Sequence, residues 1–467
     1  MTASKSFSAA AVFAAAALGA AASASAAMFK DGDRVVFFGD SITAGGSYHR
    51  FLSDYYLTRC PDADIRFFNA GVGGDNSFGA LRRFTDDVAA RHPTAVSVMF
   101  GMNDFGFRCC NDTETEENIR EQAKRIADYR ANMSALFDLC AETCPAAALY
   151  MLTPTPFDDA PVVHGRDGKV VERHPGANAG IGNCAAVVRE DAEKHGATLV
   201  DLYTVLNDSM RSRRRKDPSE IFARDRVHVC SGIHLLAAMA FLEAQNADRV
   251  VSDIALREGR CIKSVKAEVS DIVTNAAGGI AFTVLEKSLP MPFCGGVESF
   301  TNAPSVAAFN QQVLAFYCLC DGDWTLKIDG IEICTASAAE WERGVNLAFN
   351  EKTPQHRQAM AVAKANDVRW HKSGSVESRR QGLRRLFRSR MPKENLDPEK
   401  PEDREAYLAK MLPKLNQWDV EPWKTTVKEW DDQARLLAEC EAAWPGVRAL
   451  AKPMLHRYEL VRKDYTK

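Results

Sequence analysis

The feature that most constrains the fold is a regular alternation, from Arg34 to about Asp253, of short apolar runs with longer amphipathic segments. The apolar runs have strand length and no polar alternation, which is typical of strands buried on both faces. This order predicts an α/β domain in which helices cover both faces of a parallel sheet of about five strands. The expected strands are Val35–Phe38, Ile65–Phe68, Ala95–Phe100, Ala147–Leu152 and Thr198–Leu202, and the expected helices are Tyr48–Thr58, Phe78–Ala90, Glu116–Leu139, Ala179–His195 and Gly232–Asp248.

A serine stands at the end of the first expected strand, where Val35–Phe38 runs directly into Gly39-Asp40-Ser41. In sheets of this kind, ligands bind at the carboxyl ends of the strands. Free backbone N–H groups at a strand–loop–helix junction favour negative charge, so a serine there is placed to attack an acyl carbon while its own N–H holds the oxyanion. Taken alone the motif is weak, because an ordinary helix N-cap serine has the same pattern.

The next two strand ends also carry residues suited to binding an oxyanion. The second strand leads into a glycine-rich loop within Phe67–Ser77, which holds Gly73 and Gly74, and the third leads into Asn103 and Asp104. Glycine lets the backbone aim an N–H at a substrate, and the asparagine amide donates a further hydrogen bond. A tight turn and an Asx-turn are the simpler interpretations of these loops. Three consecutive strand ends of this type, all at one edge, favour a site.

Asp225 and His228 lie three residues apart, just before the last expected helix of the domain. This spacing allows the carboxylate to accept a hydrogen bond from Nδ1 of the imidazole, which leaves Nε2 free to take the proton of a serine. A lone Asp-x-x-His is common by chance, so its value depends on the loops that precede it. His234 is the competing base, but its place between apolar helix residues is typical of a packed histidine.

The ordered set of these blocks resembles the SGNH hydrolase superfamily of GDSL-type lipases and esterases, over about Arg34–Ala247. The resemblance implies a flavodoxin-like, three-layer α/β/α domain. It also implies that Ser41 is the nucleophile, His228 its base and Asp225 the acid. The oxyanion hole would consist of Ser41, Gly74 and Asn103, with Gly73 as a one-residue register alternative to Gly74. Asp40 and Asp104 would be supporting residues.

One departure from the family pattern concerns the loop after the histidine. The family often places a proline directly after it and a glycine five residues on, where this chain has Val229 and Ile233.

The rest of the chain divides by texture. Residues 1–27 have a lysine, an alanine-rich apolar stretch and a small-residue cut site, which predicts a signal peptide cleaved near Ala26 or Ala27 and an exported protein, periplasmic or extracellular. We expect a hydrolase domain at 28–254, a β-rich accessory region at 255–337 and a mainly helical region at 338–467.

Composition excludes several classes of function. The formal net charge is -3, and the basic run RSRRRK at 211–216 is expected to be a solvated helix face, so no nucleic-acid partner is indicated. Thirteen cysteines fit an exported protein without defining a pairing, and no ligand spacing predicts a metal site. We expect no cofactor and no stable membrane anchor, while the oligomeric state stays open.

These features predict a secreted serine esterase that hydrolyses carboxylic esters, with deacetylation of a carbohydrate, such as an acetylated polysaccharide, as the first expectation. The alternatives are a lipid or short-chain acyl esterase or lysophospholipase, a sugar O-acyltransferase, and a non-catalytic glycan-binding protein on the same scaffold. The long loop Thr153–Gly176 is expected to overhang the catalytic edge, although a plain surface excursion fits it equally well.

Overall fold

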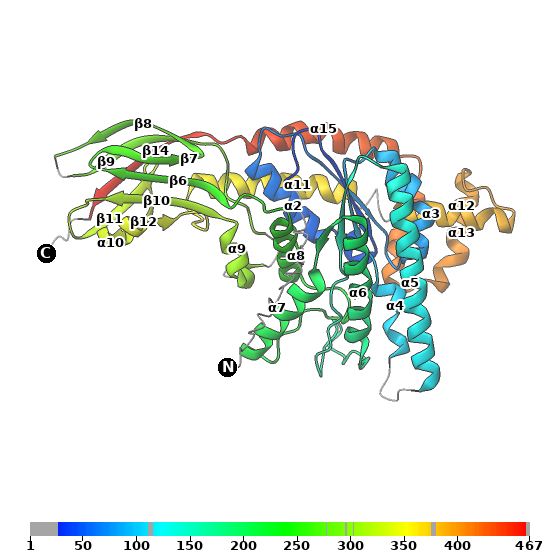
Figure 1. Ribbon diagram of the computed structural model, residues 1–467. Coiled ribbons are helices and arrows are strands. Elements are labelled where there is room, and N and C mark those ends of the chain that lie inside the picture. Colours follow the sequence, from blue (N-terminus) through cyan, green and yellow to red (C-terminus); the bar gives the residue numbers. More distant parts are fainter. Residues whose placement is uncertain are drawn as a thin grey trace, which may run out of the picture.

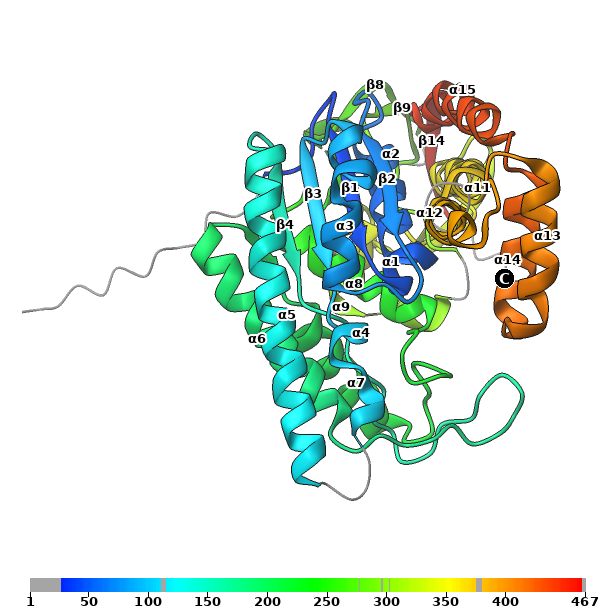
Figure 2. The ribbon, with the colours of Figure 1, turned by 90° about the vertical axis from the view of Figure 1, so that its right-hand side faces the viewer.

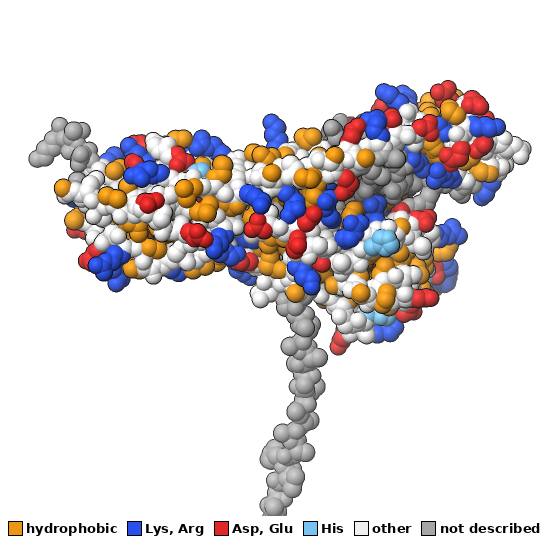
Figure 3. All heavy atoms as spheres, turned by 90° about the horizontal axis from the view of Figure 1, so that it is seen from above, with side chains coloured by type: hydrophobic (Ala, Val, Ile, Leu, Met, Phe, Trp, Pro, Cys, Tyr) orange, Lys and Arg blue, Asp and Glu red, His pale blue; other side chains and the backbone are white. Residues whose placement is uncertain are grey.

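The computed structural model describes residues 27–110, 115–276, 278–294, 297–301, 303–374 and 380–463. The expected signal peptide therefore lies outside the described residues, except for its last residue. Among the described residues, no helix combines the length and the apolar character needed to cross a bilayer. Seen from above, basic and acidic side chains are interspersed over the surface (Figure 3), as the small net charge suggests.

A five-stranded parallel sheet forms the centre of the α/β part of the molecule, with strand order β2-β1-β3-β4-β5 (Figure 2 labels the first four of these). Its central strands are mostly apolar and almost entirely buried, which is the pattern of a sheet covered on both faces. The strands are β1 (Arg34–Gly39), β2 (Arg66–Gly71), β3 (Ala95–Met99), β4 (Ala148–Leu152) and β5 (Thr198–Val200).

Helices cover both faces of this sheet. On one face lie α3 (Ser77–Asp87), α5 (Glu116–Thr143) and α6 (Ala177–His195), in front of the strands in Figure 2; on the other lie α2 (Ser47–Arg59) and α8 (Ser231–Ala244). The expected three-layer α/β/α class with five parallel strands is confirmed. Two short helices, α1 (Ser41–Gly45) and α4 (Met102–Phe105), follow β1 and β3 at the carboxyl edge.

Two details differ from the expectation. Strand β2 continues to Gly71, because it pairs with β1 along its whole length, so the glycine-rich loop begins later than expected. A further helix, α7 (Leu202–Lys216), begins where the fifth strand was expected to end. The buried residues Leu202, Leu206 and Met210 recur every four residues, which is the helical signal that its strongly polar remainder obscured.

Two sheets that share one core form a C-terminal β-sandwich, at the left of Figure 1. Their strand orders are β13-β10-β6-β7 and β12-β11-β14-β9-β8. The strands are β6 (Val250–Arg257), β7 (Arg260–Val265), β8 (Ala267–Thr274), β9 (Ile280–Glu286), β10 (Gln311–Tyr317), β11 (Asp323–Ile328), β12 (Ile331–Ser337), β13 (Val345–Asn346) and β14 (Leu455–Arg462).

The C-terminal helices connect this sandwich to the α/β domain. Helix α11 packs on both α2 and α15, and α15 runs along the top of the molecule and leads into β14, which pairs between β9 and β11 (Figure 1). The end of the chain thus returns to the β-rich region. The helices of the C-terminal region are α9 (Pro304–Ala308), α10 (Ala338–Arg343), α11 (Pro354–Gly374), α12 (Arg380–Arg390), α13 (Pro401–Met411), α14 (Gln417–Lys428) and α15 (Gln433–Ala451).

Candidate active site

The first component of the site is the junction between β1 and α1. Ser41 is the first residue of α1, and Asp40 caps the helix by accepting a hydrogen bond from the Ile42 N–H at 2.9 Å. Asp40 is only 2% exposed. Burial raises its pKa to about 7, against the opposing hydrogen bond from Ile42. The Ser41 backbone N–H lies in the first turn, where helix N–H groups have no partner within the helix.

The glycine-rich loop forms a turn over residues 72–75, closed by a 3.2 Å hydrogen bond from the Asp75 N–H to the Val72 carbonyl. Gly74 has φ of +73°, a left-handed conformation that strongly favours glycine, whereas Gly73 has no positive φ. Both glycines are exposed. Among the described residues, neither glycine N–H has a hydrogen-bond partner, so both remain available to an incoming ligand.

The loop after β3 is tied to the glycine-rich loop by two contacts. The Asn103 side-chain amide donates to the Asp75 carbonyl at 2.8 Å, which orients its NH2 group and leaves the second N–H of that group for another acceptor. Asp104 accepts hydrogen bonds from both the N–H and the hydroxyl of Ser77. Burial raises the pKa of Asp104, in opposition to these bonds. Asn103 and Asp104 therefore hold the two loops together.

A buried arginine that sequence reasoning missed holds the ends of β1 and β2. Arg83 of α3 donates to the carbonyls of Gly39 at 2.8 Å and Ala70 at 2.6 Å, and its charge is paired with Asp75 and Asp87. The side chain is 5% exposed. The available signal was its position on the buried face of α3, next to Phe84. Arg83 thus links the junction between β1 and α1 to the glycine-rich loop.

The loop that precedes α8 brings His228 to Ser41, which lies 187 residues earlier in the chain. Nε2 of His228 lies 2.7 Å from Oγ of Ser41, and Nδ1 lies 2.6 Å from Oδ2 of Asp225. The other carboxylate oxygen of Asp225 accepts from the backbone N–H groups of Val227 and His228. Ser41, His228 and Asp225 therefore form one hydrogen-bonded chain.

The electrostatics of this pair follow from the short contact. The hydrogen bond to Asp225 raises the pKa of His228, and burial opposes the rise. Burial pushes the pKa of Asp225 upward, but the hydrogen bonds from the His228 ring and backbone outweigh it and lower that pKa to about 2. A neutral imidazole with Nδ1 protonated and Nε2 facing the serine is the tautomer that this arrangement favours.

Two other histidines lie near α1 without reaching Ser41. His234, the competing base, is buried in α8 and stacked on Tyr48 with ring centroids 6.3 Å apart. Burial lowers its pKa to about 4. His49 bonds the Thr43 carbonyl through Nε2 at 2.8 Å, and burial lowers its pKa to about 3. Both are packed histidines rather than partners of the serine. No group of three or more His, Cys, Asp and Glu side chains suited to holding a metal occurs in the described part of the chain.

Comparison with known proteins finds a family whose model matches the part of the chain that holds this site. Residues 37–239 match the model of the GDSL-like lipase/acylhydrolase family. An acetylxylan esterase of Geobacillus stearothermophilus is 25% identical over 226 residues, which cover 45% of this chain and 93% of that protein. A solved structure of a gut microbial diltiazem-metabolizing enzyme aligns with 95% of this chain and 100% of its own, at 25% identity and a TM-score of 0.84.

The resemblance stated from the sequence motifs is thus confirmed, and the shared architecture extends well beyond the hydrolase domain into the C-terminal half. Through residues 37–239, this chain is similar to the ester hydrolases of the GDSL-like lipase/acylhydrolase family.

Proposed function

We propose that the protein hydrolyses carboxylic esters through an acyl-enzyme on Ser41, with His228 as the general base and Asp225 as the acid that orients it. The observation that carries this proposal is the continuous chain of hydrogen bonds, 2.7 Å from Oγ of Ser41 to Nε2 of His228 and 2.6 Å from Nδ1 to Asp225. A serine hydroxyl is a weak nucleophile unless a base within this distance takes its proton.

In the first half-reaction, Oγ of Ser41 attacks the ester carbonyl while His228 takes the hydroxyl proton. The Ser41 N–H, the Gly74 N–H and the free N–H of the Asn103 amide stabilise the oxyanion that develops on the carbonyl oxygen. The imidazolium, stabilised by Asp225, then gives its proton to the leaving alcohol. The C–O bond to the alcohol breaks and the acyl group remains on Ser41.

In the second half-reaction, water takes the place of the alcohol. His228 removes a proton from the water as it attacks the acyl carbon, and the same three donors hold the second oxyanion. The collapse of this intermediate breaks the bond to Ser41, which recovers its proton from His228. The products are a carboxylic acid and a free enzyme.

We propose an acetyl group on a carbohydrate as the ester that is cleaved. The relative of Geobacillus stearothermophilus is an acetylxylan esterase, and the expected export would bring the protein to polysaccharides outside the cytoplasm. Within the loop 153–176, residues 161–176 are mostly exposed and combine charged and histidine side chains with the exposed Val162 and Val170. Such a surface suits a hydroxyl-rich alcohol better than the acyl chain of a lipid.

The test is a panel of esters with matched concentrations: acetylated xylo-oligosaccharides, 4-nitrophenyl acetate and a lysophospholipid. We expect labelling of Ser41 by a fluorophosphonate, release of acetate from the sugar esters and the highest kcat/KM on them. A higher kcat/KM on the lysophospholipid would contradict the carbohydrate substrate. Transfer of acetyl to an added sugar acceptor, in place of release as acetate, would contradict hydrolysis.

A further inference from the structure

The loop 153–176 contains a β-hairpin over residues 163–171. Hydrogen bonds of 2.8 Å join the Val171 N–H to the Val163 carbonyl and the Gly165 N–H to the Lys169 carbonyl. At the base of the hairpin Val163 is fully buried, whereas His164 and 166–170 at its tip are exposed. Figure 2 shows this loop reaching away from the body of the molecule at the lower right. The hairpin is therefore a hydrogen-bonded projection with a buried base.

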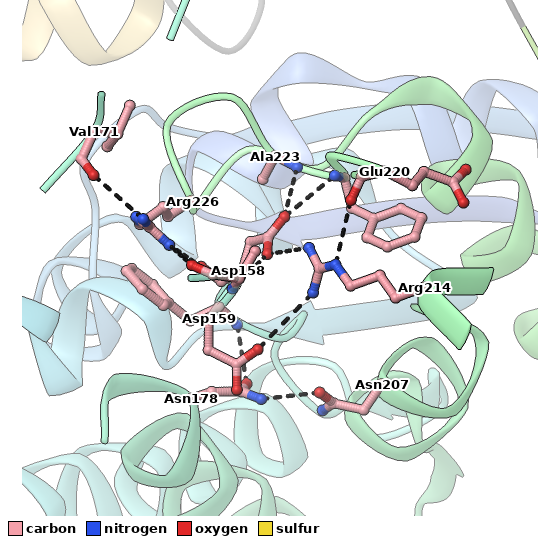
Figure 4. Close-up of polar contacts among 12 residues, drawn as sticks. Asp158, Asp159, Val171, Asn178, Asn207, Arg214, Glu220, Ala223 and Arg226 are labelled. Carbon is pink, nitrogen blue, oxygen red and sulfur yellow. Dashed lines mark hydrogen bonds and ion pairs between the residues drawn. The ribbon is translucent and has the colours of Figure 1, made fainter. Parts of the chain in front are cut away.

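Arg226 connects the foot of this hairpin to residues 222–228, the loop that holds Asp225 and His228 and is called the catalytic loop below. It lies between Asp225 and His228 in sequence, yet it is 1% exposed and points away from them into the loop. Its guanidinium donates to the carbonyls of Ala160 at 2.7 Å, Asp158 at 3.0 Å and Val171 at 3.2 Å. All three acceptors belong to the hairpin and the segment leading into it, as Figure 4 shows for Asp158 and Val171.

The backbone of Arg226 supports a specific role for its side chain. Its φ is +68°, a left-handed conformation that glycine adopts without cost and an arginine does not. The tight turn from Asp225 to His228 needs this conformation at one position. A chain that places arginine there accepts the strain and gains the buried guanidinium.

Asp158 makes the same connection in the opposite direction. It is completely buried, and its carboxylate accepts from the N–H groups of Phe222 and Ala223, both at 3.2 Å, at the start of the catalytic loop. Its own N–H donates to the Arg226 carbonyl at 2.8 Å. Arg214 of α7 pairs with the same carboxylate (Figure 4). The expectation of a solvated face for RSRRRK is therefore wrong at Arg214, whose side chain is 18% exposed.

These contacts make the hairpin base and the catalytic loop one unit, with His228 at its edge. The tip of the hairpin also lies within electrostatic reach of the imidazole: the pKa of His228 is raised chiefly by Asp225, and the charge of Arg166 opposes this rise. In the proposed reaction His228 protonates the leaving alcohol, so a segment fastened to the loop that holds His228 lies on the alcohol side of the ester, opposite the oxyanion donors.

We propose that the hairpin 163–171 forms the wall of the site that receives the alcohol half of the ester. Arg226 is the positioning residue that keeps this wall and His228 in a fixed position relative to one another. The exposed tip carries His164, Arg166, Asp167 and Lys169, whose hydrogen-bonding groups suit a polyhydroxylated alcohol. This inference rests on the proposed esterase function and deepens it.

The first experiment compares two acetyl esters that differ only in the alcohol: an acetylated xylo-oligosaccharide and 4-nitrophenyl acetate. In a variant with residues 164–170 replaced by Gly-Gly, the ratio of kcat/KM for the sugar ester to that for the nitrophenyl ester falls about tenfold, as the loss of one or two hydrogen bonds predicts. The ratio is insensitive to the fraction of folded enzyme, because misfolding lowers both rates equally. Fluorophosphonate titration gives that fraction independently.

The second experiment tests Arg226 through a double-mutant cycle. Arg226→Gly keeps the left-handed backbone and removes the anchor, and it should lower the same ratio by a similar factor. Adding Arg226→Gly to the shortened hairpin should lower the ratio no further, because the two changes remove one coupled interaction. Arg226→Lys keeps the charge without the planar fork and should restore the ratio only in part. The exposed Arg224 lies in the same loop, and Arg224→Ala is the matched control that should leave the ratio unchanged.

The outcomes separate the two levels of the proposal. A wild-type protein that turns over neither ester and is not labelled by the fluorophosphonate contradicts the esterase function itself. An active wild type whose ratio is the same in the shortened variant contradicts only the alcohol-side wall. A fully additive cycle, or an Arg226→Gly variant that behaves like Arg224→Ala, contradicts the positioning role of Arg226.

Discussion

The Ser41 side of the site is buried, whereas the His228 side is exposed to solvent. Asp40, beside the serine, is 2% exposed, while the side chains of Asp225 and His228 are 56% and 50% exposed. On the buried side, Arg83 fastens the ends of β1 and β2 to one another, and Asp104 fastens the loop after β3 to Ser77. On the exposed side, the loop 222–228 lies outside the core and is held by its attachment to the loop 153–176.

This difference separates two ways of holding catalytic groups in position. A junction within a packed core is rigid because every displacement creates a clash: a Cβ added at Gly71 would lie 2.2 Å from the backbone nitrogen of Ala44. An exposed loop lacks such neighbours and depends on specific polar anchors, here Arg226 and Asp158. Changes on the buried side should affect chemistry and stability together, whereas changes on the exposed side should affect chemistry and specificity with less loss of stability.

The largest effect is expected for Ser41→Ala. Without the hydroxyl no acyl-enzyme can form, so turnover of 4-nitrophenyl acetate should fall by about 10⁴-fold or more. The Asp40 cap of α1 remains in place, so the melting temperature should hardly change. Initial rates of the purified variant are the measurement, and turnover close to that of the wild type would place the nucleophile elsewhere.

The oxyanion side is tested by Asn103→Ala. Loss of this donor should lower kcat by roughly 10²–10³-fold with little change in KM, because the hydrogen bond strengthens in the transition state. Asn76→Ala is the control from the adjacent loop: it removes the N-cap of α3, which accepts from the Gly79 N–H at 2.9 Å, and should cost about 1 kcal/mol of stability. If Asn76→Ala lowers kcat as much as Asn103→Ala does, the effect on rate is one of loop structure.

On the exposed side, Asp225→Asn should lower kcat by about 10–10²-fold, less than for a fully buried acid, because solvent partly replaces the carboxylate.

Asp225 raises the pKa of His228, and activity requires the neutral imidazole. In the wild type, activity should therefore fall as the pH drops through a value above the ordinary histidine pKa. In the variant this limb should move to lower pH. A kcat–pH profile that keeps its acid limb in place would show that His228 and Asp225 are not coupled.

The smallest effect is a pH dependence of stability caused by Asp40. Its pKa is about 7 in the folded protein and near the ordinary value of 3.8 when unfolded, so between these values the folded state binds the extra proton. The stability of the wild type should accordingly fall as the pH rises from about 4 to about 7, by roughly 1–3 kcal/mol relative to Asp40→Asn, which does not titrate. Urea unfolding of both proteins at the two ends of this range measures the difference. If the difference in free energy of unfolding between the two proteins is the same at both pH values, Asp40 is ionised in the folded protein.

The sequence predicted the hydrolase domain well because its signals are local. Apolar runs such as Val35–Phe38 and Ala95–Phe100 mark buried parallel strands through their own composition, and residues at the ends of such strands meet at one edge whatever the details of packing. Ser41, Asn103 and His228 could therefore be assigned to one edge from their positions in the chain. The register of the turn at Gly73 and Gly74 could not, since it depends on how far β2 pairs with β1.

What the sequence by itself determined is the class of fold, because periodicity and turn residues act over a few positions. It also predicted the order of the site loops and the chemistry that we propose for them. Only the tertiary structure decided which side chains fasten those loops. Arg83 holds two strand ends, and Arg226 and Asp158 join segments 68 residues apart. Strand β14 pairs with β9 although most of the C-terminal half of the chain lies between them in sequence. Such pairings depend on which surfaces pack together. The sequence alone does not distinguish an arginine that will be buried from one that stays in solvent.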